Sequence, residues 1–194
     1  MGDKSFYRIL KLNELIKDLG KVSGDVIEFG IWNGNNLFTI KKLLDFYRQK
    51  KKLYGYDNFS GFPNPVGFNK LRKSKGLYAG DENLIKFIIR FFKFKDIEII
   101  NNDILNLELY KKKFKKLSFI YIDCNVFKPV EKILNLLGNK ISKNGYIAFD
   151  EGLNNKKSGE GKALNEFYKK NKKKFKLIKL KKNYQPDVLL KRIK

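Results

Sequence analysis

Histidine is absent from the 194-residue chain, and cysteine occurs once, at Cys124. Without histidine, the chain can form neither a Ser-His-Asp triad nor a Cys-His pair, and it has no histidine metal ligand. A single cysteine excludes an intrachain disulfide and a cysteine-rich zinc site. Any bound metal ion must therefore use oxygen ligands, which favours a hard cation such as Mg²⁺.

Long apolar runs are also missing. No run approaches the roughly 20 residues that a membrane-spanning helix needs, and the first residues show no signal-peptide pattern. We therefore expect no membrane span and a cytoplasmic location. The length is most simply that of one domain with a substantial core, so we expect a single domain over residues 1–194.

Acidic residues are outnumbered by basic ones, 20 to 43, which gives a net charge of +23. Such a charge favours an anionic partner, for example nucleic acid or an anionic membrane surface. However, the excess is nearly all lysine, whereas arginine is the usual residue for bidentate recognition of phosphates and bases. The arginines are Arg8, Arg48, Arg72, Arg90 and Arg192. We therefore attribute the positive charge mainly to a lysine-rich composition. Nucleic-acid binding stays an alternative, and the charge could also attract anionic substrates.

The most informative stretch is 24–34, which reads Gly-Asp-Val-Ile-Glu-Phe-Gly-Ile-Trp-Asn-Gly. A short apolar strand leads into a glycine-bounded turn, and apolar residues at helical spacing follow from Leu37, with Asn35 or Asn36 as the expected N-cap. A strand, a glycine turn and a helix open a nucleotide-binding α/β domain. The spacing is neither G-x-G-x-x-G nor that of a P-loop, which counts against dinucleotides and nucleoside triphosphates.

A carboxylate, Glu28, stands just before the first glycine of this turn, Gly30. A carboxylate suits a ligand with an ammonium group and hydroxyls better than it suits pyrophosphate. S-adenosylmethionine has an amino acid tail, a ribose and no phosphate, so it fits. An ordinary strand-to-helix turn, with glycines for packing, is the alternative, and this stretch alone does not separate the two.

Strand and helix patterns alternate along the rest of the chain. Helices are predicted over 6–19, from about 36, after the N-cap Asp81, and over 105–114, 126–141 and 162–171. Strands are predicted over 26–29, 52–57, 97–100, 117–123, 146–149, 175–180 and 188–193. The pattern indicates an α/β fold that closes in a hairpin. The stretch 59–80 is rich in proline, glycine and aromatic residues, which is typical of a lid beside a ligand site.

Acidic residues stand at or near the end of one predicted strand after another. They are Glu28, Asp57, Asp103, Asp123 and the pair Asp150–Glu151. A single acid in such a place is commonly a turn former, but the repetition is harder to attribute to chance. In an open parallel sheet, ligands bind beyond the carboxyl ends of the strands. We therefore predict a ligand site at this edge, with Asp57 placed to bind ribose hydroxyls.

Three of these acids, Asp123, Asp150 and Glu151, converge if the strands over 117–123 and 146–149 are neighbours. Clustered carboxylates repel one another unless a cation or a proton lies between them. A divalent ion would satisfy this requirement, and it could lower the pKa of a substrate hydroxyl and orient it. Pairing of the carboxylates with nearby lysines is the alternative.

Several of these motifs, in this order and spacing, resemble the macrocin O-methyltransferase (TylF-type) family. The motifs are 24–34, Asp57–Pro63, Tyr121–Asp123, Asn144–Glu151 and Gly161–Phe167. The resemblance covers nearly the whole chain. It implies an S-adenosylmethionine-dependent, Mg²⁺-dependent sugar O-methyltransferase. It also implies a Rossmann-like class I methyltransferase fold, whose mostly parallel seven-stranded sheet has the order 3-2-1-4-5-7-6 and helices on both faces.

The resemblance also assigns site residues by motif position. Those implied for the cofactor are Glu28, Phe29, Gly30, Trp32, Gly34, Asp57, Asn58, Ser60, Asn102, Asp103 and Asp123. Those implied for the metal are Asp123, Asp150 and Glu151.

The chain departs from the family pattern after the fourth strand, where Asp123-Cys124-Asn125 replaces Asp-Gly-Asp. The family's second aspartate is the proposed general base, and Asn125 cannot take a proton at neutral pH. The positions expected to matter for catalysis are therefore Asp123, Asn125 and Glu151, with Glu151 or a metal-bound hydroxide as candidate bases. The family's usual Asp-Asp metal pair is also changed, to Asp150–Glu151.

The resulting hypothesis is an O-methyltransferase that acts on a hydroxyl of a sugar, a nucleotide sugar or a glycosylated small molecule. The basic charge suggests RNA methylation as an alternative, although no Asp/Asn-Pro-Pro-aromatic motif follows the fourth strand. The asparagine at 125 suggests a second alternative, a degenerate cofactor-binding protein without activity. The sequence does not identify the acceptor, and a homodimer is compatible with it.

Overall fold

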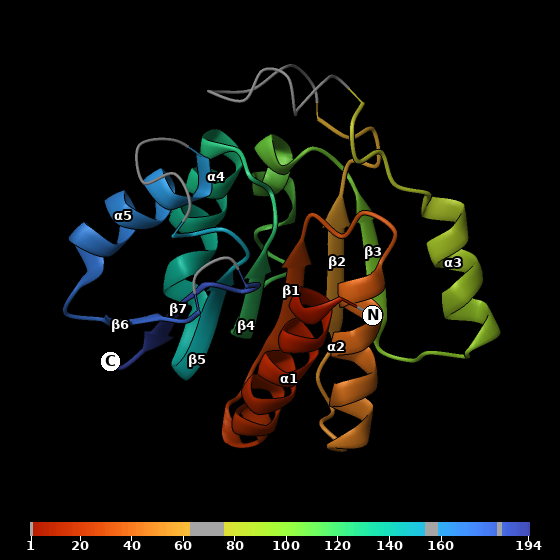
Figure 1. Cartoon of the computed structure of the whole chain (residues 1–194), viewed down its shortest axis with the longest axis horizontal. Coiled ribbons are helices and arrows are strands. Elements are labelled where there is room, and N and C mark those ends of the chain that lie inside the picture. Colours follow the sequence, from red (N-terminus) through yellow and green to blue (C-terminus); the bar gives the residue numbers. More distant parts are fainter. Residues whose placement is uncertain (1, 63–75, 154–158, 182–183) are drawn as a thin grey trace.

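The computed structural model describes residues 2–62, 76–153, 159–181 and 184–194 (Figure 1). Seven strands form one sheet in the order β3-β2-β1-β4-β5-β7-β6, which confirms the expected fold. The strands are β1 (Asp25–Phe29), β2 (Leu53–Asp57), β3 (Ile97–Asn101), β4 (Leu117–Ile122), β5 (Ile141–Phe149), β6 (Phe175–Lys179) and β7 (Val188–Arg192). Each strand overlaps a stretch that the sequence predicts.

Helices connect these strands and cover both faces of the sheet. The α-helices are α1 (Asp3–Asp18), α2 (Asn35–Phe46), α3 (Glu82–Phe91), α4 (Phe127–Leu137) and α5 (Gly159–Asn171). Short 3₁₀ helices are η1 (Leu19–Lys21), η2 (Ile104–Tyr110) and η3 (Gly138–Lys140). Within the described ranges, no helix has the length and apolar character needed to cross a bilayer.

The direction of the strands brings their carboxyl ends to one edge of the sheet. β1 pairs in parallel with both β2 and β4, so the strand order reverses between β1 and β4. β4 and β5 are also parallel, whereas β7 runs antiparallel between β5 and β6. The ends of β1, β2, β4 and β5 therefore lie side by side, at the place where open α/β sheets bind ligands.

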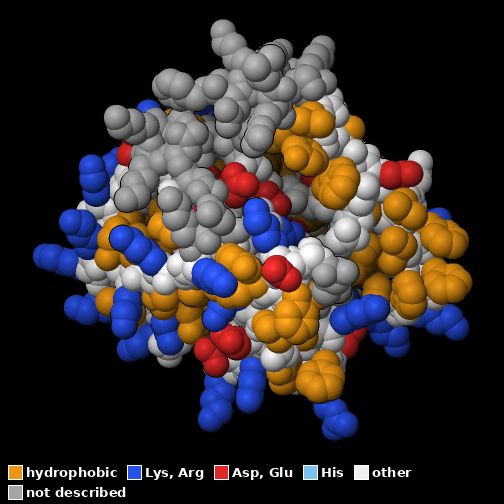
Figure 2. Space-filling model, in the orientation of Figure 1, with side chains coloured by type: hydrophobic (Ala, Val, Ile, Leu, Met, Phe, Trp, Pro, Cys, Tyr) orange, Lys and Arg blue, Asp and Glu red, His pale blue; other side chains and the backbone are white. Residues whose placement is uncertain are grey.

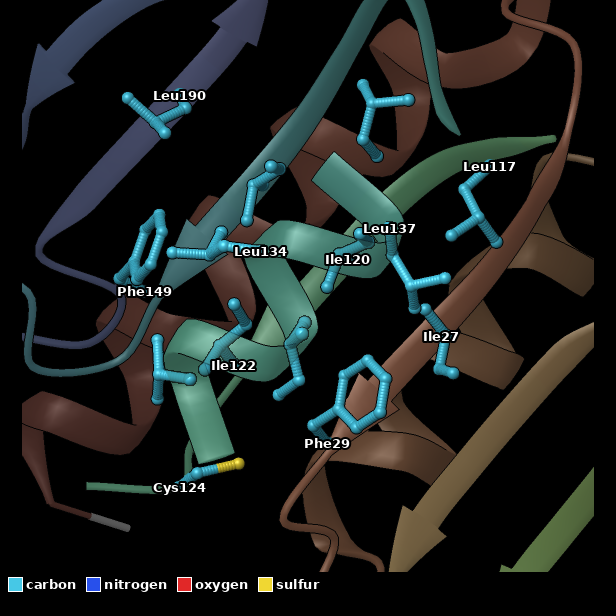
Figure 3. Packing of buried hydrophobic residues seen from close by; sticks show 14 of the residues in the cluster. Ile27, Phe29, Leu117, Ile120, Ile122, Cys124, Leu134, Leu137, Phe149 and Leu190 are labelled. Carbon is cyan, nitrogen blue, oxygen red and sulfur yellow. The ribbon is translucent and has the colours of Figure 1, made fainter. Parts of the chain in front are cut away.

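The hydrophobic core has one part on each face of the sheet. One face is covered by α1 and α2, which pack on the side chains of Val26, Phe119 and Tyr121. The other is covered by α4, α5 and η2, and Figure 3 shows α4 lying across Ile120, Ile122 and Phe149 on this face. Strands that are buried on both sides explain why their sequences are apolar throughout.

Strand β5 begins earlier than the sequence indicates. The predicted helix over 126–141 ends at Leu137, and the strand starts at Ile141 rather than at Tyr146. The Asn144–Gly145 pair forms an irregularity within β5, because Leu117 pairs with Ile141 but Phe119 pairs with Tyr146. A dipeptide that is typical of a turn therefore produces a bulge here, since both flanking segments still pair with β4.

The start of α2 corrects another prediction. Neither Asn35 nor Asn36 is the N-cap; that position is Gly34, which has φ +81° and makes no side-chain cap. The amide of Asn36 donates instead to Glu28 Oε1 at 3.0 Å. For α3 the prediction is confirmed, because Asp81 accepts a hydrogen bond from the backbone N–H of Leu84 at 3.0 Å.

Candidate functional site

A cavity of about 600 Å³ opens at the carboxyl edge of the sheet. Such a volume is in the range that holds a small organic ligand. Figure 2 shows acidic side chains at the bottom of a hollow on this edge, with basic side chains beside them. Predicted site residues that line the cavity are Gly30, Trp32, Asp57, Asn58, Asp103, Asp123, Asn125, Asp150 and Glu151. The strand ends therefore bring together most of the acids that the sequence singled out.

The turn after β1 is held by Asp57 at the end of β2. The carboxylate accepts the backbone N–H of Trp32 at 2.9 Å through Oδ2 and that of Phe59 at 2.8 Å through Oδ1. Burial raises the pKa of Asp57, and the two N–H groups act in the opposite direction. Each carboxylate oxygen keeps a second lone pair, so Asp57 can still accept hydrogen bonds from the hydroxyls of a ligand in the cavity.

The described ends of the predicted lid, 59–62 and 76–80, form one wall of the cavity together with Trp32. The indole Nε1 of Trp32 donates to the carbonyl of Ala79 at 3.2 Å, and its ring meets Tyr78 edge-on at 6.0 Å. Residues 63–75 of the predicted lid lie outside the described residues. Likewise, residues 154–158 of the polar loop before α5 are not described.

Asp103 and its neighbour Asn102 differ in their surroundings. Asp103 lines the cavity, and its Oδ1 accepts the N–H of Leu105 at 2.8 Å, which caps η2. The side-chain amide of Asn102 donates instead to the hydroxyl of Tyr110 at 3.1 Å, and Asn102 is not among the lining residues. Of this predicted pair, only Asp103 is therefore in place to contact a ligand directly.

Other predicted cofactor residues also stay away from the cavity surface. These are Glu28, Phe29, Gly34 and Ser60. Phe29 packs in the core against Tyr56, with 5.4 Å between the ring centroids, and Gly34 is the N-cap of α2. Their assignment to a cofactor stays a prediction.

Glu28 is a buried carboxyl beneath the turn, with 1% of its surface exposed. Its Oε1 accepts from Asn36, whereas its Oε2 has no hydrogen-bond partner among the described residues. Burial raises the pKa of Glu28 to about 8, although the hydrogen bond from Asn36 and the charge of Arg8 lower it. Near neutral pH, Glu28 therefore holds a proton in a large fraction of the folded molecules.

The free energy of unfolding should fall as the pH rises from about 4.5 to about 8, because Glu28 keeps its proton longer in the folded state. Its stabilising contribution is full below the unfolded pKa of 4.5 and is lost as the pH rises through the folded value. The slope should reach ~1.4 kcal/mol per pH unit. Replacing Glu28 by glutamine keeps the acceptor for Asn36 and should flatten the slope, measured by urea unfolding of the cofactor-free protein.

Other buried acids also contribute to this measurement. Burial raises the pKa of both Asp150 and Asp187 to about 6, so they contribute a slope of the same sign below that pH. The comparison is therefore made above pH 6. Burial also raises the pKa of Asp123 and Glu160 well above their ordinary values, so the contribution of Glu28 is taken from the difference between the wild-type and variant slopes. Glu14→Gln, at an exposed position on α1, serves as the control and should keep the wild-type slope. An unchanged slope in Glu28→Gln would contradict the assignment.

The acids at the ends of β4 and β5 form the other end of the cavity. Asn125, which has φ +58°, donates to Asp123 Oδ1 at 3.3 Å. The hydroxyl of Tyr121 donates to Asp150 Oδ1 at 2.5 Å. Burial and then the charge of Asp150 raise the pKa of Asp123 well above its ordinary value, while Arg8 lowers it. An acid with a raised pKa that borders a cavity is suited to accept a proton from a bound ligand.

The predicted metal set is not assembled as a metal site. Across the described ranges, no three acidic or cysteine side chains form a group that could hold a metal ion. Asp123, Asp150 and Glu151 all border the cavity, but Asp150 is 2% exposed and already engaged by Tyr121 and Arg8. Beside Asp150, Arg8 thus supplies a positive charge where the sequence-based prediction placed a divalent cation.

Three residues of this end were not anticipated from the sequence: Arg8, Gln185 and Glu160. Arg8 and Gln185 line the cavity and are hydrogen-bonded to each other. Glu160 is buried, and its Oε2 accepts the N–H of Glu151 at 2.9 Å. The scarcity of arginine in a lysine-rich chain is the one signal that could have drawn attention to Arg8.

Comparisons with known proteins agree with this architecture. The model of the family described as Macrocin-O-methyltransferase (TylF) matches residues 5–183. A comparison with curated protein sequences gave no significant match.

Solved structures of methyltransferases superpose on most of the chain. The O-methyltransferase NovP aligns with a TM-score of 0.79 and 18% identity over 96% of this chain and 80% of that chain. The apo structure of CalS11, a TDP-rhamnose 3'-O-methyltransferase, gives 0.73 and 18% over 98% of this chain and 81% of that chain. An O-methyltransferase from Bacillus cereus in complex with SAH gives 0.65 and 10% over 97% and 81%. At these identities, the likeness shows the fold.

Proposed function

The chain belongs to the macrocin O-methyltransferase (TylF) family, and we propose that it transfers a methyl group from S-adenosylmethionine to a hydroxyl of a sugar-type small molecule. The observation that carries this proposal is that one cavity is lined by all four of the acids Asp57, Asp103, Asp123 and Glu151. The first two form a donor end for the cofactor. The last two belong to an acceptor end, together with Arg8, Asp150 and Gln185.

The residues of the donor end fit the cofactor by their chemistry. Asp57 has carboxylate lone pairs available for ribose hydroxyls, as described above. Asp103 has a free carboxylate oxygen for an amino group of the base, and Ile104 and Leu105 offer apolar surface beside it. Gly30 and Trp32 border the space left for the methionine part. Glu28 lies beneath this turn and would act there through Asn36 rather than by direct contact.

At the acceptor end, the chain's own task is to orient a hydroxyl and remove its proton. When bound, S-adenosylmethionine supplies the methyl group on a sulfonium, which leaves as a thioether. The acceptor oxygen forms a bond to the methyl carbon as the carbon–sulfur bond breaks, and the hydroxyl proton passes to the carboxylate of Asp123. Asn125 keeps that carboxylate in one orientation through its hydrogen bond. Glu151 is the second candidate for the base.

A sugar-type acceptor suits the polar lining of this end. Asp123, Glu151 and Gln185 offer acceptors and donors for several hydroxyl groups. Lys128 also lines the cavity and offers a positive charge to an anionic group, as a nucleotide sugar would have. The family and the activity of CalS11 on a TDP-sugar agree with this class of acceptor.

Magnesium was part of the expectation from the sequence, but the residues present fit it poorly. A divalent ion needs carboxylate oxygens that are free to coordinate it. Asp150 is buried and already accepts hydrogen bonds, and the described residues form no group of three acids that could hold an ion. The proposed reaction therefore includes no step through a metal.

Binding of S-adenosylhomocysteine tests the donor end without knowledge of the acceptor. We expect saturable binding in isothermal titration calorimetry and an affinity about 10–100-fold lower in Asp57→Ala, which loses the charged acceptor for the ribose. Asp45→Ala is the matched control, because that carboxylate is 51% exposed, pairs with the buried Lys41 of α2 and does not line the cavity. Wild-type protein that shows neither binding heat nor a rise in melting temperature at high ligand concentration would refute the proposal.

RNA methylation remains the second enzymatic proposal, because the net charge of +23 favours an anionic polymer. A panel of nucleotide sugars, glycosides and RNA, assayed for release of S-adenosylhomocysteine, distinguishes the two. Cofactor binding without turnover on any of them would favour the non-catalytic alternative. A single domain, a cytoplasmic location and a possible homodimer accompany the proposal as expectations from the sequence.

A further inference from the structure

Arg8 reaches from α1 into the acidic end of the cavity. Its Nη2 lies 3.4 Å from Asp150 Oδ1, and the side chain is 24% exposed, whereas that of Asp150 is 2% exposed. The same nitrogen donates a hydrogen bond to Oε1 of Gln185, in the segment before β7. Contacts from two distant parts of the chain thus fix the guanidinium beside a buried carboxylate.

The charge of Arg8 acts on Asp123 as well as on Asp150. Asp150 has a further donor, the hydroxyl of Tyr121, which binds the same Oδ1 atom that faces Arg8. These contacts place a positive charge directly beside Asp150, in a cluster of carboxylates that otherwise repel one another.

A divalent ion at the same carboxylates would have to displace these contacts. It would also lie close to a guanidinium that stays charged at every accessible pH, and like charges at short range inside a protein repel strongly. The acids that the family resemblance assigns to a metal are therefore present, but the guanidinium of Arg8 already lies beside Asp150, where the ion would bind.

We propose that the guanidinium of Arg8 is the resident cation of the acceptor end and keeps divalent ions out of the Asp123, Asp150 and Glu151 set. This proposal rests on the proposed function, because its consequence for catalysis is a methyl transfer that needs no added metal. Arg8 is then a positioning residue: it neutralises Asp150 and holds the acidic group together around the acceptor. No reacting atom needs to touch it.

Removing the charge should create a metal site, and this gain can be measured without cofactor or acceptor. The probe is Mn²⁺, whose free aqua ion is counted by electron paramagnetic resonance. We expect no uptake by the wild-type protein at millimolar Mn²⁺, and no uptake by Arg8→Lys, which keeps a positive charge. Arg8→Ala should bind one Mn²⁺ at least tenfold more tightly than the wild type. Adding Asp150→Asn to Arg8→Ala should abolish the gain.

Two results would overturn the proposal. One is stoichiometric Mn²⁺ binding by the wild type that is lost in Asp150→Asn, which would restore the metal site of the family. The other is a folded Arg8→Ala protein that gains no binding, which would show that Arg8 does not keep ions out. If Arg8→Ala does not fold, judged by circular dichroism, Arg8→Met and Arg8→Gln replace it, and the wild-type measurement alone still decides the first result.

The same samples separate this proposal from the proposed function. Titration with S-adenosylhomocysteine reports on the donor end alone, and Mn²⁺ uptake reports on the acceptor end alone. Absence of S-adenosylhomocysteine binding would refute the methyltransferase proposal. The role of Arg8 would still be tested by the Mn²⁺ measurement. If turnover is found, it should be unchanged by EDTA.

Discussion

Methyl transfer should fall by about 10²–10⁴-fold when Asp123 is replaced by asparagine, the range expected when a general base is lost. The substitution preserves the size of the side chain at the cavity wall and removes its negative charge and its ability to take the proton. Because Asn125 donates to Asp123 Oδ1, an amide oxygen at 123 can accept the same bond. The loss should therefore appear in kcat, measured by release of S-adenosylhomocysteine with an acceptor found in the panel.

Controls separate this loss from a structural effect. Asp96→Asn changes an aspartate of φ +58° just before β3, at the opposite edge of the sheet, and should leave kcat as it is. Affinity of Asp123→Asn for S-adenosylhomocysteine should stay within tenfold of the wild type. If Asp123→Asn retains activity and Glu151→Gln loses it, the base is Glu151, and the assignment to Asp123 is wrong.

A single methyl group at Gly30 should destabilise the protein by ~3–5 kcal/mol, from overpacking and from an unfavourable backbone conformation. Gly30 has φ +82°, and a Cβ built there lies 2.0 Å from the backbone oxygen of Asp123. Asp123 directly follows β4, so the clash can be relieved only by moving the segment after β1 away from the segment after β4. Against a total stability of about 5–15 kcal/mol, such a loss is large.

Substitutions at two other glycines separate the steric from the conformational part of the destabilisation expected for Gly30→Ala. Gly76→Ala meets the same kind of backbone, φ +79°, with no atom of the described residues within 4 Å of the new Cβ, so it measures mainly the conformational cost. Gly20→Ala has only an ordinary contact of 3.7 Å and should change the melting temperature little. We expect urea unfolding to rank Gly30→Ala far below both. A Gly30→Ala protein as stable as Gly76→Ala would mean that the strand ends are not held as closely as described.

The sheet could be predicted from the sequence because its strands combine two independent signals. Segments such as Leu117–Ile122 are apolar throughout, and an acid follows directly, so both the buried strand and its carboxyl end are marked. The start of β5 lacks such a mark. Asn144–Gly145 is typical of a turn, and only pairing with β4 shows that the chain remains in the sheet there.

The site could be predicted only as far as strand ends determine it. Parallel strands share an edge, so Asp57 and Asp123 were expected together, and both line the cavity. The pattern could not decide which side chains of β1 reach the surface, because Glu28 and Phe29 point to opposite faces and both are buried. The role of Arg8 could not be predicted for another reason. Its contacts with Asp150 and Gln185 depend on how α1 packs against the complete sheet.

The antiparallel strand β7 has a consequence for how the molecule is made. It is inserted between β5 and β6, so while the nascent chain leaves the ribosome, one edge of β5 stays unpaired until residues 188–192 have been synthesised. That edge includes the apolar run Tyr146–Phe149, and an open apolar edge invites pairing with other chains. Chains released before residue 188 would therefore be the ones most exposed to aggregation.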